Sequence, residues 1–350
     1  MLLKDLQQKE LPEGEHIVVE ERNGLIEALH RTHVAVVDRD GEILYSSGNP
    51  HHFTYTRSCI KPIQALPVLY LGAADEFDFT EEEVAMCAAS HSGEAEHIKI
   101  IQSMMDKIGI TEEDLRCGGH APFHKETAKK LGADYKKVHD NCSGKHTGAI
   151  ATCKKMGWDI ENYTSLDHPL TEEIIKLISE LVSIEKSDIY LGSDGCDIPN
   201  FGIPISKMAQ LFAILADPKN NKYEPALKNM KGAFIKHSYL IAGTGRFDTI
   251  MMRDHPKKLL SKAGAAGLQT MAAEVDGNWL GISIKVEDGS YPACEVLSFR
   301  ILKEIGLFNE NGEGIRYQPK VIKTRSKKRA GSVIALGRLS GKIDRKTESF

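Results

Sequence analysis

Alternating apolar and polar positions predict antiparallel strands near both ends of the chain. Three pairs of such segments are each joined by a glycine-containing dipeptide: 16–21 and 25–30 by Asn23-Gly24, 34–38 and 42–46 by Asp40-Gly41, and 268–275 and 278–286 by Asp276-Gly277. These dipeptides accept the positive backbone angles of tight hairpin turns. We therefore expect hairpins in the first fifty residues and again after residue 267.

A helical period governs the middle of the chain. Thr80 and Glu83 form a capping box that opens a helix over residues 81–89, and residues 94–108 carry an apolar stripe that faces a core. A helix also begins at Ser58, although Pro67 should kink or end it. Further helices are expected at residues 125–131, 144–156, 170–182, 206–215, 223–240 and 292–305. The last forty residues are polar and read as loops.

This order of elements predicts an α+β fold. An antiparallel sheet forms from the N- and C-terminal strands and is flanked by helices, with a helical middle region. A chain of 350 residues can bury the core of one large unit with two lobes. We place a single catalytic unit at residues 1–310, with a sheet-containing lobe and a helical region, and a C-terminal tail of unknown role at residues 311–350.

Composition and charge exclude several classes of protein. The net charge is −4 with both signs interspersed, whereas nucleic-acid or membrane-surface binding needs a concentrated basic face. The one basic run, residues 320–329, is interpreted as a solvated tail segment. Residues 1–15 contain no apolar stretch, so no signal peptide is expected, and no window is long enough to span a bilayer. Seven scattered cysteines do not form a disulfide framework. These features indicate a soluble cytoplasmic protein.

Several short segments could carry chemistry. In Arg57-Ser58-Cys59-Ile60-Lys61-Pro62 the serine and the lysine, three positions apart, share one helix face. A desolvated lysine can take the serine proton and create a nucleophile, but the same spacing also occurs in solvated helix turns. Ser90, in the segment 88–93, is either a second hydroxyl of the site or part of an ordinary turn between helices.

Basic residues and thiols extend the list of candidates. Arg246 lies in a glycine-rich loop and suits a carboxylate ligand. Lys285, near the end of a strand expected to be buried, is either a base or an edge lysine in solvent. Cys142 and Cys196 each lie in a polar loop and could bind zinc, or they could be two buried, inert thiols, since no Cys-x-x-Cys pair is present.

Taken in order, six segments resemble the asparaginase II family, the thermolabile rhizobial-type L-asparaginases. The match extends from about residue 16 to residue 307, and its specific parts are Arg57-Ser58-x-x-Lys61-Pro62-x-Gln64, Ser90-His91-Ser92-Gly93, Asn141-Cys142-Ser143-Gly144-Lys145-His146, Asp194-Gly195-Cys196, Gly243-Thr244-Gly245-Arg246, and Lys285 before Asp288-Gly289. The resemblance implies a fold similar to that of serine β-lactamases and glutaminases. Lys285-Val286-Glu287 departs from the β-lactamase Lys-Thr-Gly motif, so penicillin chemistry is not expected.

The resemblance also implies a set of site residues. It pairs Ser58 with Lys61 and Ser90 with Lys285 as two Ser-Lys tandems, and it forms a zinc site from Cys142, Lys145 and Cys196. Arg57, His146 and Asp194 fall where the family contacts substrate, and His91, Gly243 and Arg246 are further substrate-binding candidates. A homodimer is implied as well.

The predicted reaction is hydrolysis of the side-chain amide of L-asparagine to L-aspartate and ammonia. One serine attacks while its lysine accepts the proton, and we favour Ser90 with Lys285 as the nucleophile-bearing pair, with Ser58 and Lys61 as the relay. Arg57 or Arg246 would bind the α-carboxylate and Asp194 the α-ammonium group. Two alternatives stay open: a glutaminase or other small-amide hydrolase, and a non-catalytic amino-acid-binding or zinc-binding protein.

Overall fold

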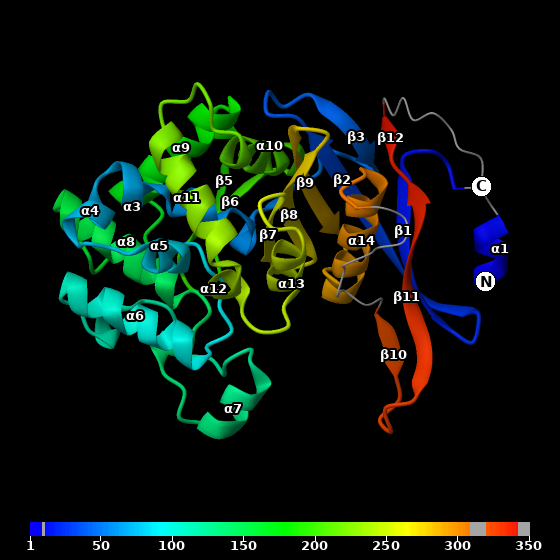
Figure 1. Ribbon diagram of the computed structural model, residues 1–350, viewed down its shortest axis with the longest axis horizontal. Helices are drawn as coiled ribbons and strands as arrows, with labels where there is room; N and C mark the ends of the chain where they lie inside the picture. The colour runs from blue at the N-terminus through cyan, green and yellow to red at the C-terminus, as the bar shows by residue number, and fades with distance from the viewer. Residues whose placement is uncertain (9–10, 309–319, 342–350) are drawn as a thin grey trace.

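The computed structural model of the protein describes residues 1–8, 11–308 and 320–341. Within these residues the main sheet is antiparallel and has nine strands, nearly all provided by the two ends of the chain (Figure 1). They are β1 (Glu15–Arg22), β2 (Leu25–Val37), β3 (Ile43–Ser47), β7 (Leu259–Gly264), β8 (Leu268–Val275), β9 (Asn278–Val286), β10 (Val321–Lys323), β11 (Arg329–Arg338) and β12 (Ser340–Gly341). Their order is β10-β11-β1-β2-β9-β8-β7, and β3 joins β2 and β12.

The helices of the described residues lie partly on the two faces of this sheet and partly beside it (Figure 1). They are α1 (Leu3–Gln8), α2 (Lys61–Gln64), α3 (Leu66–Tyr70), α4 (Ala73–Glu76), α5 (Glu81–Cys87), α6 (Ala95–Ile108), α7 (Lys125–Leu131), α8 (Ser143–Met156), α9 (Pro169–Val182), α10 (Ile205–Ala216), α11 (Glu224–Lys236), α12 (Ser238–Ala242), α13 (Phe247–Asp254) and α14 (Tyr291–Glu304). Successive residues of β2 point to opposite faces of the sheet. Ala35 packs in the core that contains α10, and Val34 packs in the core that contains α14. Both cores therefore depend on one strand.

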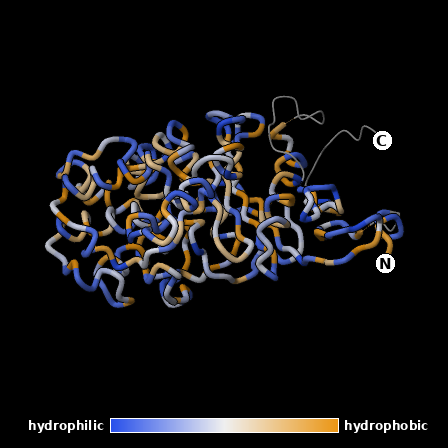
Figure 2. Tube along the Cα trace, turned by 90° about the horizontal axis from the view of Figure 1, so that it is seen from below, coloured by the Kyte–Doolittle hydropathy of each residue, from blue (hydrophilic) through white to orange (hydrophobic). Residues whose placement is uncertain are grey.

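The α+β architecture expected from the sequence is confirmed. The three predicted hairpins form, and Asn23, Gly24 and Gly277 adopt the positive φ angles that their turns require. The expected segments 25–30 and 34–38 are one strand, because β2 pairs with β1 in its first half and with β3 and β9 in its second half. Figure 2 shows the N-terminus toward one end of an elongated molecule, with apolar and polar stretches alternating along the trace.

Several elements were missed by the sequence patterns. The expectation that the last forty residues are loops is wrong, because β11 pairs with β1 along seven residue pairs and the basic run 320–329 lies around the β10–β11 hairpin. The expected boundary at residues 310/311 lies outside the described residues. The helix predicted over 223–240 divides into α11 and α12, and neither α13 nor β7 was anticipated.

A second, three-stranded sheet was also not predicted. It has the order β4-β6-β5 and consists of β4 (Phe53–Tyr55), β5 (Tyr190–Ser193) and β6 (Pro199–Pro204). These strands are short and contain glycine and proline, so no alternating pattern marks them. The sheet brings the segment before Arg57 next to the loop that holds Asp194.

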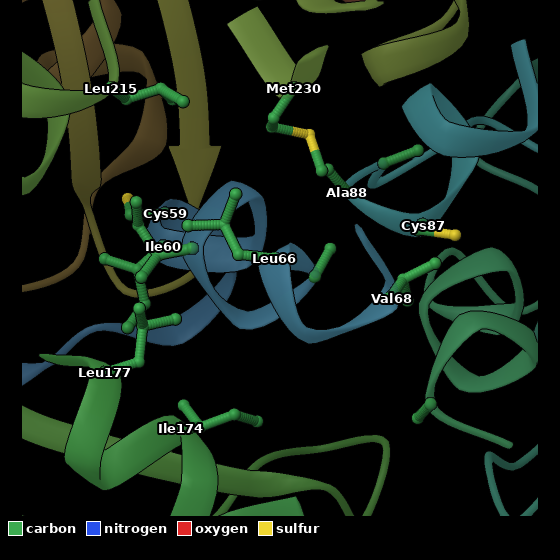
Figure 3. Close-up of a cluster of buried hydrophobic side chains, with 14 of the residues drawn as sticks. Cys59, Ile60, Leu66, Val68, Cys87, Ala88, Ile174, Leu177, Leu215 and Met230 are labelled. Atoms are coloured by element: carbon green, nitrogen blue, oxygen red, sulfur yellow. The ribbon is translucent and has the colours of Figure 1, made fainter. Parts of the chain in front are cut away.

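The segment after Arg57 is anchored in the helical core. Figure 3 shows Cys59, Ile60 and Leu66 among side chains of α5, α9, α10 and α11. Pro67 does not kink a continuous helix, because α2 ends at Gln64 and Pro67 occupies the first turn of α3, where proline is tolerated. Within the described residues, no helix combines the length and apolar character that a bilayer crossing demands.

Candidate active site

Ser58 lies in a short 3-10 helix, Arg57–Ile60, that continues directly into α2. Arg57 adopts a φ of 47°, which is unfavourable for a residue with a side chain, and the backbone N–H of Arg57 donates to Asn200 Oδ1 at 3.0 Å. Strained backbone of this kind persists where surrounding contacts hold it, and it often marks a functional site. The neighbouring residues Cys59 and Ile60 are fully buried.

Lys61 is completely buried one helical turn after Ser58. Its Nζ donates to the carbonyl oxygens of Ala89, at 2.7 Å, and Asn141, at 3.4 Å. The two carbonyls belong to the segments that carry Ser90 and Cys142, so Lys61 connects three of the predicted site segments. A direct hydrogen bond to the Ser58 hydroxyl is not formed within the described residues.

Ser90 pairs with a lysine that the sequence analysis did not select. Lys262 Nζ lies 2.8 Å from Ser90 Oγ and also donates to the carbonyl of Ala263 at 2.9 Å. Lys262 is fully buried in β7, and this burial, reinforced by the nearby charge of Lys61, lowers the pKa of its amine to about 7. A lysine with that pKa is partly neutral at physiological pH and can accept a proton.

The expected pair of Ser90 and Lys285 is therefore wrong. Lys285 lies in β9, and its Nζ donates to the carbonyls of Ala266, Val286 and Glu287. The sheet order β9-β8-β7 separates the two lysines by two strand spacings, roughly 10 Å. The register also differs, because Lys262 lies opposite Thr270, whereas Lys285 lies opposite Leu268.

A cavity of about 350 Å³ brings both serines to one surface. Its lining contains residues from seven separate segments: Ser58, Ser90, Phe123, Asn141, Arg246, Ala263, Gly264, Ala265 and Tyr291. Ser58, Ser90 and Arg246 were predicted, while Phe123 and Tyr291 were not. A volume of this size accommodates a small-molecule substrate beside the two hydroxyls.

Two thiols and an amine converge next to this cavity. The Cys142 and Cys196 side chains are hydrogen-bonded to each other, and Lys145 contacts Cys196. All three side chains are almost completely buried. The hydrogen bond from Cys142 and the charge of Lys145 overcome burial and lower the pKa of Cys196 to about 6. Across the described residues, no group of three or more His, Cys, Asp or Glu side chains is arranged for a metal ion.

Arg57 and Asp194 form an ion pair on the other side of Ser58. Arg57 Nε donates to Asp194 Oδ1 at 2.8 Å, and the backbone N–H of Gly195 donates to the same oxygen. Burial alone would raise the pKa of Asp194, but Lys145, the Gly195 N–H and Arg57 outweigh it and lower that pKa. Asp194 is thus a carboxylate that joins the thiol cluster to the Ser58 segment.

His146 is buried and keeps one ring nitrogen without a partner among the described residues. Its Nδ1 lies 2.6 Å from the Tyr163 hydroxyl, which accepts from the backbone N–H of Arg116. Burial lowers the pKa of His146 to about 4, so the ring is neutral at physiological pH. A buried ring nitrogen, Nε2, without a partner indicates space for a ligand or water.

His91 does not face the cavity, although it was a substrate-binding candidate. Its Nδ1 accepts from the backbone N–H of Gly93 at 3.1 Å, and its Nε2 lies 2.9 Å from Ser143 Oγ. Because the Ser143 hydroxyl donates to the carbonyl of Val138, His91 Nε2 must be the donor to Ser143. Both ring nitrogens are therefore occupied, and His91 connects the Ser90 segment to the start of α8.

Gly243 supports the loop that carries Arg246. It adopts a φ of 116°, and a Cβ atom at this position would lie 2.6 Å from Ser92 Oγ and 2.7 Å from Glu94 Oε1. Only glycine permits this approach. Thr244 then donates from its backbone N–H and its hydroxyl to Glu94, both at 2.7 Å. The role of Gly243 is thus to fix the loop against the Ser90 segment.

One sequence signal could have identified Lys262. Lys262-Ala263-Gly264 ends a strand and is closer to the Lys-Thr-Gly motif than the segment around Lys285 is. Asp248 was also missed; it is buried and accepts hydrogen bonds from Ser261, Gln269 and the backbone N–H of Ala263. These bonds fix β7 at the position where Lys262 meets Ser90.

Comparison with known proteins gives a family match and distant structural similarities. The L-asparaginase II family model matches residues 18–335, and no curated protein sequence matches the chain. The chain is similar to a probable glutaminase from Bacillus subtilis complexed with 6-diazo-5-oxo-L-norleucine, with 13% identity and a TM-score of 0.36 over 79% of this chain and 84% of that chain. A β-lactamase from Sphaerobacter thermophilus DSM 20745 is 12% identical, with a TM-score of 0.42 over 80% of this chain and 92% of that chain.

Proposed function

Because the chain belongs to the L-asparaginase II family, whose members are amidohydrolases, we propose that it hydrolyses the side-chain amide of L-asparagine. The products are L-aspartate and ammonia. The observation that carries this proposal is the contact between Ser90 and Lys262, in which a serine hydroxyl meets an amine whose pKa is about 7. Binding alone would not require such a base beside a serine.

In the proposed reaction, Ser90 Oγ attacks the amide carbon while Lys262 takes the hydroxyl proton. The C–N bond then breaks, and the nitrogen leaves as ammonia after receiving that proton. Water next attacks the resulting ester and gives up a proton to Lys262. The ester C–O bond then breaks, Lys262 returns that proton to Ser90 Oγ, and aspartate leaves. Ser58 supplies a second hydroxyl at the same cavity, and Lys61 lies buried one helical turn after it. We assign these two residues the proton relay, which requires Lys61 Nζ to turn from the Ala89 carbonyl toward the Ser58 hydroxyl.

The developing oxyanion needs donors at the cavity wall. The backbone N–H of Ser58 lies in the first turn of a helix, where no intrahelical carbonyl is available to it. The backbone N–H of Ala265, next to Gly264, borders the same cavity. We propose these two groups as the oxyanion donors.

Zinc is proposed at Cys142, Lys145 and Cys196. Two thiols and an amine at one point form a donor set that suits zinc. Bound zinc would supply a fixed positive charge that orients the loops around the site. Coordination requires a neutral amine and thiolates, so binding would release protons.

The central test measures ammonia release from asparagine and from glutamine, together with ring opening of a penicillin, which releases no ammonia. Activity on asparagine, with at least roughly tenfold lower kcat/KM on glutamine, supports the proposal, because one methylene changes binding by about 1–3 kcal/mol. Preference for glutamine, or no amide hydrolysis at all, would refute it. Labelling with the diazo-ketone analogue of asparagine, followed by peptide mass spectrometry, should place the adduct on Ser90; an adduct on Ser58 would exchange the two roles.

Removal of metal tests the zinc assignment. Dialysis against a chelator should remove about one equivalent of zinc, measured by elemental analysis, and should lower the melting temperature, because a ligand that binds only the folded state stabilises it. The variant Cys117→Ser, which changes a buried thiol outside the cluster, should keep its zinc, and Cys196→Ser should not. A wild-type protein purified without zinc that also fails to bind added zinc would contradict the assignment.

Two expectations from the sequence analysis stay predictions. The homodimer can be checked by sedimentation velocity on the full chain, and the cytoplasmic location by cell fractionation. The assignment of Asp194 to the α-ammonium group also stays a prediction, and it draws support from the oxygen Oδ2, since both hydrogen bonds described above use Oδ1.

A further inference from the structure

Arg246 reaches the cavity between two aromatic rings. Its guanidinium carbon lies 5.4 Å from the centre of the Phe123 ring and 5.9 Å from the centre of the Tyr291 ring. All three residues line the cavity that holds Ser58 and Ser90. A planar guanidinium held by aromatic faces keeps one orientation, which matters for binding a planar carboxylate through two hydrogen bonds.

No carboxylate of the described residues forms an ion pair with Arg246. Burial alone would lower the pKa of the guanidinium, but Tyr291, Asp248 and Glu295 lie near enough to raise it. Asp248 accepts hydrogen bonds from Ser261, Gln269 and the backbone of Ala263, and Glu295 pairs with Lys320. A substrate anion that enters the cavity can therefore form the direct charge-assisted contact that Arg246 does not make with either acid.

The other candidate cation is in a different position. Arg57 already has its carboxylate in Asp194, at 2.8 Å. A substrate carboxylate at Arg57 would compete with Asp194 for the guanidinium. At Arg246 the substrate carboxylate would form a new ion pair without displacing another carboxylate. This difference separates the two arginines that the sequence left as equal choices.

We propose that Arg246 binds the α-carboxylate of the amino-acid substrate, with Phe123 and Tyr291 as positioning residues that hold the guanidinium. This inference rests on the proposed function, since it takes the substrate amide to lie at Ser58 and Ser90. It makes Arg246 the residue by which the site selects α-amino-acid amides over amides that lack a carboxylate.

The segment that follows Ser90 connects the proposed carboxylate-binding residues to the nucleophile. The loop before Phe123 packs on this segment, since a Cβ atom at Gly93 would lie 2.9 Å from Pro122, and the backbone N–H of His124 donates to Ser92 at 3.0 Å. The loop before Arg246 joins the same segment through Thr244 and Glu94. The fold therefore fixes the distance between Arg246 and Ser90, and a fixed distance suits a substrate of one length.

The experiment compares asparagine with 3-aminopropanamide, which is asparagine without its α-carboxylate. In Arg246→Met, kcat/KM for asparagine should fall about 100-fold, as expected for losing a charge-assisted bidentate contact, while the slow hydrolysis of 3-aminopropanamide should change less than about threefold. Phe123→Ala and Tyr291→Leu should raise KM for asparagine about tenfold and leave kcat nearly unchanged. Arg253→Met, on an exposed arginine of the same helix, is the matched control and should behave as wild type.

Equal losses for both amides in Arg246→Met, or no loss for asparagine, would overturn the inference. Calorimetric binding of L-aspartate gives a readout that does not depend on catalysis: wild type and Arg253→Met should bind, and Arg246→Met should bind at least about tenfold more weakly. A wild-type protein that binds aspartate through Arg246 but hydrolyses neither amide would sink the proposed function and leave this inference standing. Unchanged aspartate affinity in Arg246→Met would sink the inference alone.

Discussion

Lys262 and Lys285 occupy similar positions in the sheet but have different neighbours. Both are buried in strands of its catalytic end, and burial lowers the pKa of both amines. Lys262 meets the hydroxyl of Ser90, whereas Lys285 meets three backbone carbonyls. A carbonyl has no proton to give up, so in this arrangement Lys285 fastens the end of β9 and has no contact with the hydroxyl of Ser90.

The comparison shows that burial alone does not make a lysine a base. The neighbour that shares the proton decides its role, and in a sheet the strand order and register select that neighbour. The residue of β9 that lies level with Lys262 across β8 is Ser283, not Lys285. Lys285 is therefore displaced from Ser90 both by its strand and by its position along that strand. Substitutions at the two sites should therefore have opposite consequences.

The largest effect is expected from Lys262→Met. Removing the base beside Ser90 should lower kcat for asparagine by about 10²–10⁴-fold, the range that general base catalysis contributes. Steady-state ammonia release measures this change. Activity within about threefold of wild type would show that Lys262 is not the base.

The pH dependence of stability tests the lowered pKa of Lys262 separately from catalysis. The pKa of Lys262 falls from 10.5 to about 7 on folding, so between these pH values the unfolded chain holds a proton that the folded chain lacks. Wild-type stability should therefore rise with pH across this window, and it should rise less in Lys262→Met. Equal pH dependence in the two proteins, measured by urea unfolding, would contradict the lowered pKa.

A change of pH should have an intermediate effect on kcat/KM for asparagine. The base must be neutral, so kcat/KM for asparagine should rise about tenfold per pH unit below a midpoint near pH 7 and level off above it. Lys285→Met should keep the same midpoint. A profile that is flat from pH 5 to pH 9 would mean that no group with this pKa controls the reaction.

The smallest effect on activity is expected from Lys285→Met. The substitution removes the hydrogen bonds of Lys285 to the carbonyls of Ala266, Val286 and Glu287, of which Val286 keeps a donor in the backbone N–H of Gly289, so the free energy of unfolding should fall by about 1–3 kcal/mol. Activity at 25 °C should stay within about threefold of wild type. A loss of activity as large as that of Lys262→Met, in a protein that remains folded, would restore Lys285 to the catalytic group.

Local sequence predicted the elements that carry strong periodic patterns. The hairpin turns at Asn23-Gly24 and Asp276-Gly277, the capping box of Thr80 and Glu83, and the helix after Glu94 all form as expected. The Ser58, Ser90 and Arg246 positions were found because short motifs mark them, and they do line one cavity.

The remaining features depend on pairings that no local pattern contains. β7 contains Lys262 at a position where an apolar residue was to be expected, so the strand was overlooked together with its lysine. The partner of Ser90 is set by the register of β7 against β8, which is a tertiary property. Phe123 and Tyr291 carry no motif, and only packing brings them to Arg246.

The pairing of β1 with β11 also has a consequence for how the chain is made. Ile17 finds its cross-strand neighbour in Leu336, which a ribosome adds more than three hundred residues later. At synthesis rates of 5–20 residues per second, the apolar first strand waits roughly 15–60 s before its partner emerges. During this interval its hydrogen-bonding edge is open to other nascent chains, which makes β11 a safeguard against misassembly as well as a part of the sheet.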